Sequence, residues 1–116
     1  MEVHLTEKAE KEVYSYVNKE DWHGRIDYRL ATDAMACAAA ETALAAWRGL
    51  GCRDGGRIDL RADADGAPNF IEVNPLAGLR PEHSDLPILC ELAGMPYREL
   101  IAGIMRSALK RIRNRT

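Results

Sequence analysis

The sequence predicts an α+β domain with a mainly antiparallel sheet and packed helices. Two alternating segments joined by an Asp-Gly pair indicate a β-hairpin in the middle of the chain. Two strand-like segments and an alanine-rich helical segment precede the hairpin, and two helical segments follow it. The expected order is therefore β-β-α-β-β-α-α, in a chain whose 116 residues allow one domain at most.

The first half of the chain predicts two strands and one long helix. Residues 12–20 (EVYSYVNKE) mix valine and tyrosine with polar side chains, which is typical of a strand, and residues 25–31 (RIDYRLA) predict a second strand. The DWHG segment between them predicts a loop. Thr32 and Asp33 are good N-cap residues for an alanine-rich helix that is closed by Gly51.

The central hairpin predicts one apolar face and one polar face. With Asp65 and Gly66 as a two-residue turn, Asp59 stands opposite Glu72, and the flanking pairs follow in step. Paired residues share a face, and the faces alternate along each strand. The predicted core face comprises Ile58, Leu60, Ile71 and Val73. The predicted polar face comprises Arg57, Asp59, Glu72 and Asn74.

The polar face allows two interpretations. Carboxylates directly opposite each other repel at a cost of roughly 0.2–1 kcal/mol, so a positive charge should lie beside them. Arg57 is one source of that charge. A hard divalent cation, Mg²⁺ or Mn²⁺, is another, because it prefers side-chain oxygens such as those of Asp59, Glu72 and Asn74. The alternative is a solvated, salt-bridged hairpin face, and the spacing alone does not separate the two interpretations.

Two helices are expected after the hairpin. Residues 75–81 contain two prolines and a glycine and cannot continue the strand. Ser84 and Asp85 predict the N-terminus of a short helix that ends at Gly94. Residues 95–116 have the pattern of a final amphipathic helix, whose basic end suits the negative pole of the helix dipole better than it indicates a nucleic-acid patch.

Composition restricts the partners and the compartment. The net charge of -2 predicts no general attraction to nucleic acid, and no apolar run is long enough to cross a membrane. Alanine supplies much of the 47% hydrophobic content and aromatic residues make up only 6%, which predicts a thin core. The N-terminus lacks the apolar stretch of a signal peptide, and the cysteines form no CxxC pair, so a reducing cytoplasm is expected.

Residues 51–79, GCRDGGRIDLRADADGAPNFIEVNPLAGL, resemble the closing part of the ATP-grasp ligases of the D-alanine–D-alanine ligase family. That family carries an LGCxGxxRxD segment, a hairpin and an EVNxxPG segment in this order. Upstream, VYSYVNKE resembles the family's YDYEAKY strand, and downstream ELAGMPYRELIAGIMRSAL resembles its closing helices. The resemblance extends from about Val13 onward and implies the C-terminal portion of an ATP-grasp fold.

The resemblance implies a role for each residue of the polar face. It implies that Asp59, Glu72 and Asn74 hold a pair of Mg²⁺ ions against the phosphates of ATP, with Glu72 bridging. Arg57 corresponds to the arginine that stabilises a tetrahedral oxyanion, and Gly78 to a loop glycine whose backbone N–H assists it. The implied reaction is dipeptide formation for peptidoglycan biosynthesis, in which a D-alanine carboxylate becomes an acyl phosphate and a second amino group displaces phosphate. No residue is identified for the adenine.

The resemblance also addresses the second substrate. Lys19 and Ser84 correspond to groups near the carboxylate of the second amino acid. Three positions depart from the family pattern, because Glu20 replaces a tyrosine, Asp54 a glycine and Ala77 a proline. Because the tyrosine that Glu20 replaces closes over the substrate in the family, the second substrate is left open among D-alanine, D-lactate, D-serine and a compound outside peptidoglycan precursors.

The chain is expected to be incomplete as a ligase. Residues 1–116 correspond to a single partial ATP-grasp domain, the C-terminal half, without the family's N-terminal substrate domain, adenine hinge and glycine-rich lid. We expect no turnover by the chain alone, and binding of ATP and D-alanine-like molecules only when the missing half completes it. The alternative is a non-catalytic truncated module that acts as a binding or self-associating unit. Open sheet edges and apolar faces predict a homo-oligomer.

Overall fold

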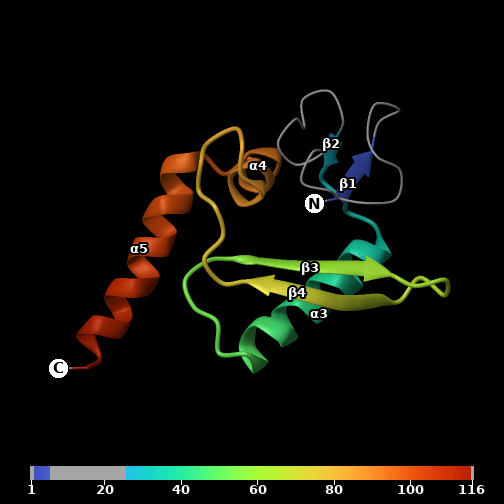
Figure 1. The fold of residues 1–116 in the computed structure, drawn as a ribbon. Helices are drawn as coiled ribbons and strands as arrows, with labels where there is room; N and C mark the ends of the chain where they lie inside the picture. Colours follow the sequence, from blue (N-terminus) through green and yellow to red (C-terminus); the bar gives the residue numbers. More distant parts are fainter. Residues whose placement is uncertain (1, 6–25, 116) are drawn as a thin grey trace. The chain divides into compact units, whose positions relative to one another are not determined.

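The computed structural model describes residues 2–5 and 26–115, and the chain divides into two units, Met1–Ala31 and Thr32–Thr116. The described elements are, in chain order, β1 (Glu2–Leu5), β2 (Ile26–Arg29), α3 (Ala34–Gly49), β3 (Arg57–Ala62), β4 (Pro68–Asn74), α4 (Asp85–Leu92) and α5 (Tyr97–Arg113) (Figure 1). Their strands form two antiparallel pairs, β1 with β2 and β3 with β4. This arrangement confirms the α+β class and the antiparallel pairing predicted from the sequence.

The first unit contains a strand pair of which only one member was predicted. β2 lies inside the predicted strand 25–31 and pairs with β1, so that Glu2 stands opposite Arg29. β1 was not predicted, because an alternation of only four residues, EVHL, is a weak signal beside the charged segment that follows it. The predicted strand 12–20 lies outside the described residues.

α3 begins and ends where the sequence predicts. The Asp33 carboxylate accepts a hydrogen bond from the backbone N–H of Ala36 at 2.8 Å, which satisfies one of the free donors at the helix N-terminus. At the other end Leu50 is the C-cap, and Gly51 follows with a φ of 70°, a conformation that glycine adopts without steric cost.

Two glycines show how closely α3 approaches the β3–β4 hairpin, against which it packs (Figure 1). At the base of the hairpin, a Cβ on Gly56 would lie 2.5 Å from Cη2 of the Trp47 ring. At the tip, a Cβ on Gly66 would lie 3.8 Å from Cε of Met35. α3 therefore runs from the tip to the base along the hairpin, and Trp47 occupies the space beside Gly56.

The hairpin has the predicted register at its base and a different one near its tip. The base keeps the predicted pairs Arg57–Asn74, Ile58–Val73 and Asp59–Glu72. Beyond them the register shifts, so that Leu60 pairs with Phe70 instead of Ile71. Ile71 is the extra residue of a β-bulge and is 58% exposed. The prediction that Ile71 belongs to the core face is therefore wrong.

The shift has its cause in the loop at the tip. The predicted two-residue turn at Asp65–Gly66 is wrong, because the N–H of Asp63 donates to the carbonyl of Ala67 at 2.9 Å and closes a longer loop. The Asp63 carboxylate accepts from the N–H groups of Asp65 and Ala67, each at 3.0 Å. It also accepts from the side-chain amide of Asn69 at 3.1 Å. These hydrogen bonds, with that of Asn69 the largest cause, hold the pKa of Asp63 below its usual range and favour the three-residue loop.

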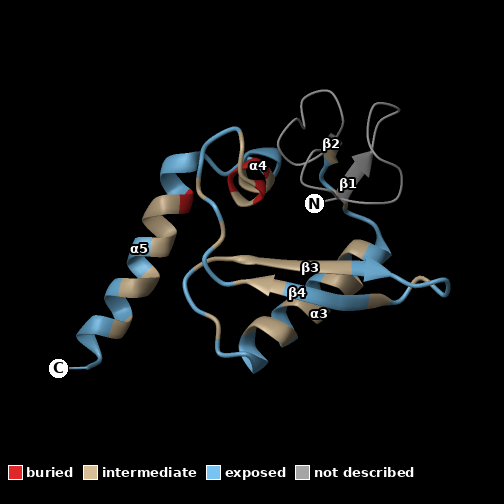
Figure 2. Ribbon diagram, viewed as in Figure 1, coloured by how far each residue is buried: buried red, intermediate tan, exposed pale blue. Residues whose placement is uncertain are grey.

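The core is thin, as the composition predicts. Among the described residues, the large hydrophobic side chains that are fully buried are Ile88 of α4 and Leu100 of α5, on two helices that pack together (Figure 2). α3 contains no fully buried residue. Exposed large apolar side chains include those of Leu44, Ile71, Leu76, Met105 and Ile112. No helix in the described part of the chain is long and apolar enough to cross a membrane.

The loop before β3 is tied to α5. Asp54 has a φ of 69°, at the position where the resembled family has a glycine. Its carboxylate accepts hydrogen bonds from both terminal nitrogens of Arg111, with Nη2 to Oδ2 at 2.8 Å. These bonds hold the pKa of Asp54 below its usual range and raise that of Arg111. The ion pair offsets the steric cost of a left-handed residue that carries a Cβ.

Candidate functional site

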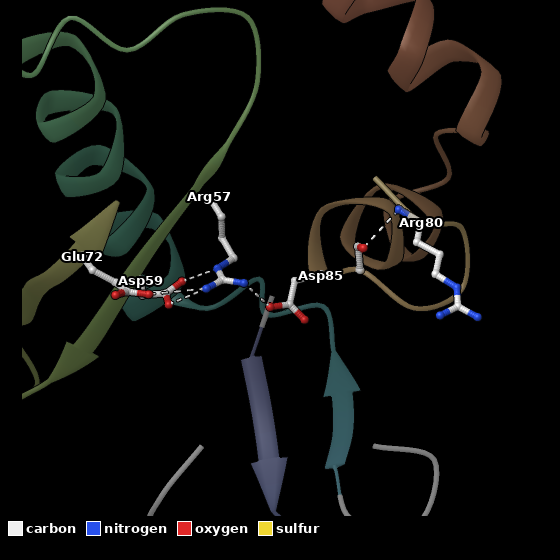
Figure 3. A network of polar contacts seen from close by, with 6 residues as sticks. Arg57, Asp59, Glu72, Arg80 and Asp85 are labelled. Atoms are coloured by element: carbon white, nitrogen blue, oxygen red, sulfur yellow. Dashed lines mark hydrogen bonds and ion pairs between the residues drawn. The ribbon is translucent and has the colours of Figure 1, made fainter. Parts of the chain in front are cut away.

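Three residues of the predicted polar face form one cluster at the base of the hairpin (Figure 3). The guanidinium of Arg57 donates from Nε to Oδ1 of Asp59 at 2.7 Å and from Nη2 to Oδ2 at 3.0 Å. The same Nη2 lies 3.5 Å from Oε1 of Glu72. Arg57 and Asp59 share a face because they are two residues apart on β3, and Glu72 stands opposite Asp59 on β4. The predicted gathering of these side chains is confirmed, while their chemical roles stay predictions.

A further residue, Asp85, belongs to the same cluster and was predicted only as a helix-capping residue. Nη1 of Arg57 donates to Oδ2 of Asp85 at 2.7 Å (Figure 3). The Asp85 side chain lies in the first turn of α4 and is only 8% exposed. A buried carboxylate is costly without a cation beside it, and Arg57 supplies one. The one sequence signal of its burial is the apolar run LPIL that follows it.

Among the described residues of this cluster, one guanidinium contacts three carboxylates. The three carboxylates differ in exposure. The side chain of Glu72 is 61% exposed and that of Asp59 is 30% exposed, while Asp85 is buried. Asp59 and Glu72 are therefore the carboxylates of the cluster that a cation from solvent could approach. Asn74, the third predicted ligand, stands opposite Arg57 at the end of β4.

The donor chemistry of this face fits a hard divalent cation. The predicted ligands are two carboxylates and an amide, all of which offer oxygen. No three His, Cys, Asp or Glu side chains within residues 2–5 and 26–115 are arranged to hold a metal ion. Both carboxylate oxygens of Asp59 also accept hydrogen bonds from Arg57. A metal ion would thus have to share Asp59 with the guanidinium or displace it, and the metal site stays a prediction.

The loop between β4 and α4 brings together Gly78 and Ser84, two further predicted site residues. A Cβ on Gly78 would lie 2.7 Å from Oγ of Ser84, so only glycine allows this approach. The Ser84 hydroxyl accepts a hydrogen bond from the backbone N–H of Arg80 at 3.0 Å (Figure 3). Ser84 is the N-cap of α4, but its side chain makes no capping hydrogen bond. Lys19, the remaining predicted site residue, lies outside the described residues.

The two parts of the site meet at one point of the chain. Ser84 closes the loop that starts at Gly78, and the next residue, Asp85, binds Arg57. The hydroxyl of Tyr97, at the start of α5, donates to the carbonyl of Leu79 at 2.7 Å. The loop is therefore held at two adjacent residues, Leu79 by Tyr97 and Arg80 by Ser84.

Comparison with known protein families places the whole described site inside one match. A family model described as the D-ala D-ala ligase C-terminus matches residues 2–106. The D-alanine–D-alanine ligase of Bordetella petrii is 41% identical over 76 residues, which cover 66% of this chain and 23% of that protein. The corresponding ligase of Synechococcus sp. is 41% identical over 81 residues, covering 70% and 24%. An uncharacterized protein, y4sG, of Sinorhizobium fredii is 36% identical over 77 residues, covering 66% and 23%.

The chain also corresponds to only about a third of the solved structures that it resembles. The crystal structure of D-alanine–D-alanine ligase from Bacillus anthracis has a TM-score of 0.68 at 25% identity, covering 83% of this chain and 34% of that one. The same enzyme complexed with ATP has a TM-score of 0.67 at 27% identity, covering 82% and 32%. The chain spans less than a quarter of the length of the curated relatives described above.

Proposed function

The chain belongs to the family of D-alanine–D-alanine ligase C-terminal regions, which have the ATP-grasp fold, and we propose that it supplies the metal-binding and oxyanion-stabilising half of an ATP-dependent carboxylate–amine ligase. In this proposal the reaction forms a dipeptide through an acyl phosphate. The names of the relatives support D-alanine-like substrates, and the similar structure complexed with ATP supports ATP as the co-substrate.

The observation that carries the proposal is the cluster of Arg57, Asp59 and Glu72. Phosphoryl transfer requires cations where negative charge spreads in the transition state, together with ligands that position them. The hairpin base provides both, since a guanidinium lies against two partly exposed carboxylates.

Each residue then has a separate task. Asp59, Glu72 and Asn74 would hold Mg²⁺, which when bound neutralises charge on the phosphates of ATP. Arg57 donates hydrogen bonds to the oxyanion that develops when the amine attacks the acyl phosphate. The backbone N–H of Gly78 assists Arg57, and Ser84, which is close to Gly78, helps to bind the carboxylate of the second substrate.

Titration calorimetry with Mn²⁺, with and without ATP, tests the proposal on the chain itself. Asp59→Asn and Glu72→Gln each remove one carboxylate, and Asp65→Asn is the matched control in the exposed hairpin loop. We expect each site variant to weaken Mn²⁺ binding by at least about tenfold, while the control binds like the wild type. The same Mn²⁺ affinity in all four proteins would exclude the site as drawn.

A non-catalytic, self-associating module is the alternative function. The observation that favours it is the number of large apolar side chains left exposed, such as Leu76 at 90% and Ile112 at 62%. In this case the chain forms a homo-oligomer by burying these side chains between copies. Light scattering over a hundredfold range of concentration would detect it, and a constant monomer mass would refute it.

A further inference from the structure

Asp85 has a contact with Arg57 that differs in kind from the contacts within the hairpin. Arg57 binds Asp59 within its own strand, but Asp85 comes from α4, 28 residues further along the chain. The guanidinium donates from Nε and Nη2 on one side and from Nη1 on the other. Carboxylates on two sides fix the plane of the guanidinium as well as its position.

Burial makes the two contacts unequal. The side chain of Asp85 is 8% exposed, while that of Asp59 is 30% exposed. A buried carboxylate that loses its cation cannot recover the loss from water, whereas a partly exposed one can. Water can therefore replace Arg57 at Asp59 more readily than at Asp85.

This inequality matters because a cation and Arg57 compete for the same oxygens. Both oxygens of Asp59 accept from Arg57, and Glu72 lies 3.5 Å from it. A divalent cation at Asp59 and Glu72 must weaken these contacts. The bond to Asp85 on the opposite side of the guanidinium is not part of this competition, so it can hold Arg57 beside the site while Asp59 changes partner.

We propose that Asp85 is a positioning residue that anchors the Arg57 guanidinium, so that Asp59 and Glu72 can pass from arginine to a divalent cation while Arg57 stays at the site. The proposal rests on the proposed function, because it assumes that these carboxylates bind a metal. It adds a residue from outside the hairpin to the site. It also connects the loop that ends at Ser84 to the metal ligands, because Ser84 and Asp85 are consecutive.

The test combines Mn²⁺ affinity with the NMR signals of Arg57, in particular that of the Nη1–H group, which donates to Asp85. In Asp85→Asn the anchor loses its charge, the guanidinium moves towards Asp59 and Glu72, and we expect Mn²⁺ to bind about tenfold more weakly, equivalent to about 1.4 kcal/mol. In the wild type we expect added Mg²⁺ to shift the Nε–H signal, because Nε donates to Asp59, but to leave the Nη1–H signal protected from solvent exchange. In Asp85→Asn we expect the Nη1–H group to exchange faster, and added Mg²⁺ to accelerate its exchange further.

A double-mutant cycle separates anchoring from a general loss of negative charge. In an Arg57→Gln background there is no guanidinium to anchor, so adding Asp85→Asn should change Mn²⁺ affinity by less than about twofold. An equal weakening in both backgrounds would overturn the proposal, and so would wild-type affinity and exchange in Asp85→Asn. Asp65→Asn is the matched control for the loss of one carboxylate.

Two further measurements apply if Asp85→Asn does not fold or if the wild type binds no Mn²⁺. If Asp85→Asn does not fold, Asp85→Glu retains the buried charge, and its extra methylene displaces the guanidinium. A wild-type Nη1–H signal and Mn²⁺ affinity in that variant would overturn the proposal. If the wild type itself binds no Mn²⁺, the proposed function fails. In that case an Arg57 Nη1–H that is protected in the wild type and exchanges rapidly in Asp85→Asn still supports anchoring, and one that is unaffected refutes it.

Discussion

Replacing Gly56 with alanine would place a methyl group where α3 meets the base of the hairpin. The new Cβ would lie 2.5 Å from Cη2 and 2.6 Å from Cζ3 of the Trp47 ring, and 2.6 Å from the carbonyl oxygen of Asn74. A tryptophan ring in a packed site has few other rotamers. The carbonyl of Asn74 belongs to the last residue of β4 and cannot move without distorting the strand pair.

The magnitude follows from these contacts. Adding a methyl group to a packed site costs typically about 1–3 kcal/mol, and we expect about 3 kcal/mol because a ring and a backbone oxygen are both in the way. In a domain of this size that loss lowers the Tm by about 12–20 °C. Thermal unfolding followed by circular dichroism measures it directly. Because Asn74 is a predicted metal ligand, the same variant should also bind Mn²⁺ more weakly.

Gly49 provides the matched control for this substitution. It is the last residue of α3, and a Cβ there would meet nothing within 4 Å. Gly49→Ala should therefore leave the Tm unchanged or raise it, since alanine favours a helix over glycine by up to about 1 kcal/mol. Trp47→Leu in the Gly56→Ala background should restore only part of the loss, because the carbonyl remains. A Gly56→Ala protein within about 0.5 kcal/mol of the wild type would refute the reasoning.

Three further predictions test the ion pairs and the left-handed backbone of Asp54. Asp85→Ala should lower the free energy of unfolding by about 2–3 kcal/mol in urea, because Arg57 keeps Asp59 but loses its buried partner; a loss below about 0.5 kcal/mol would contradict a buried ion pair. Asp54→Gly should have a higher Tm than Asp54→Ala. Both variants lose the bond to Arg111, but only glycine adopts a φ of 69° without steric cost. Equal Tm values would contradict the steric cost assigned to the left-handed backbone at this position. The pKa of Asp54 is lowered from 3.8, so the stabilisation by Arg111 is present above about pH 4 and is lost as the pH falls through the lowered folded pKa. Arg111→Gln should therefore be less stable than the wild type near neutral pH and converge with it in strong acid, and a difference that is independent of pH would exclude this cause.

The helices could be predicted because their signals are local. Asp33 caps α3 through its own side chain, and Gly51 ends it through its own backbone freedom. The predicted pairing of Asp59 with Glu72 is present in the structure, although the turn from which it was predicted is wrong. The longer loop moves the register by one residue, and the bulge at Ile71 moves it back. The alternation of polar and apolar residues fixed the outer pairs in either case.

The role of Asp85 could not be predicted, because it depends on contacts between distant segments. At the start of a helix, an aspartate is usually explained by capping, and only the packing of α4 near β3 buries this one against Arg57. The bulge was missed because the Asp63 carboxylate, rather than the Asp-Gly pair, determines the loop. Short-range turn preferences gave no weight to that side chain.

The bulge at Ile71 has a practical consequence for labelling the protein. It already absorbs a one-residue offset between the tip and the base of the hairpin, and the base keeps its own pairs from Arg57 to Asp59. An epitope or a fluorescent reporter grafted between Ala64 and Asp65 would enter an exposed stretch of chain, and the bulge would isolate the carboxylates from the inserted length. The tip is thus the natural attachment point for a probe that must observe cation binding without disturbing it.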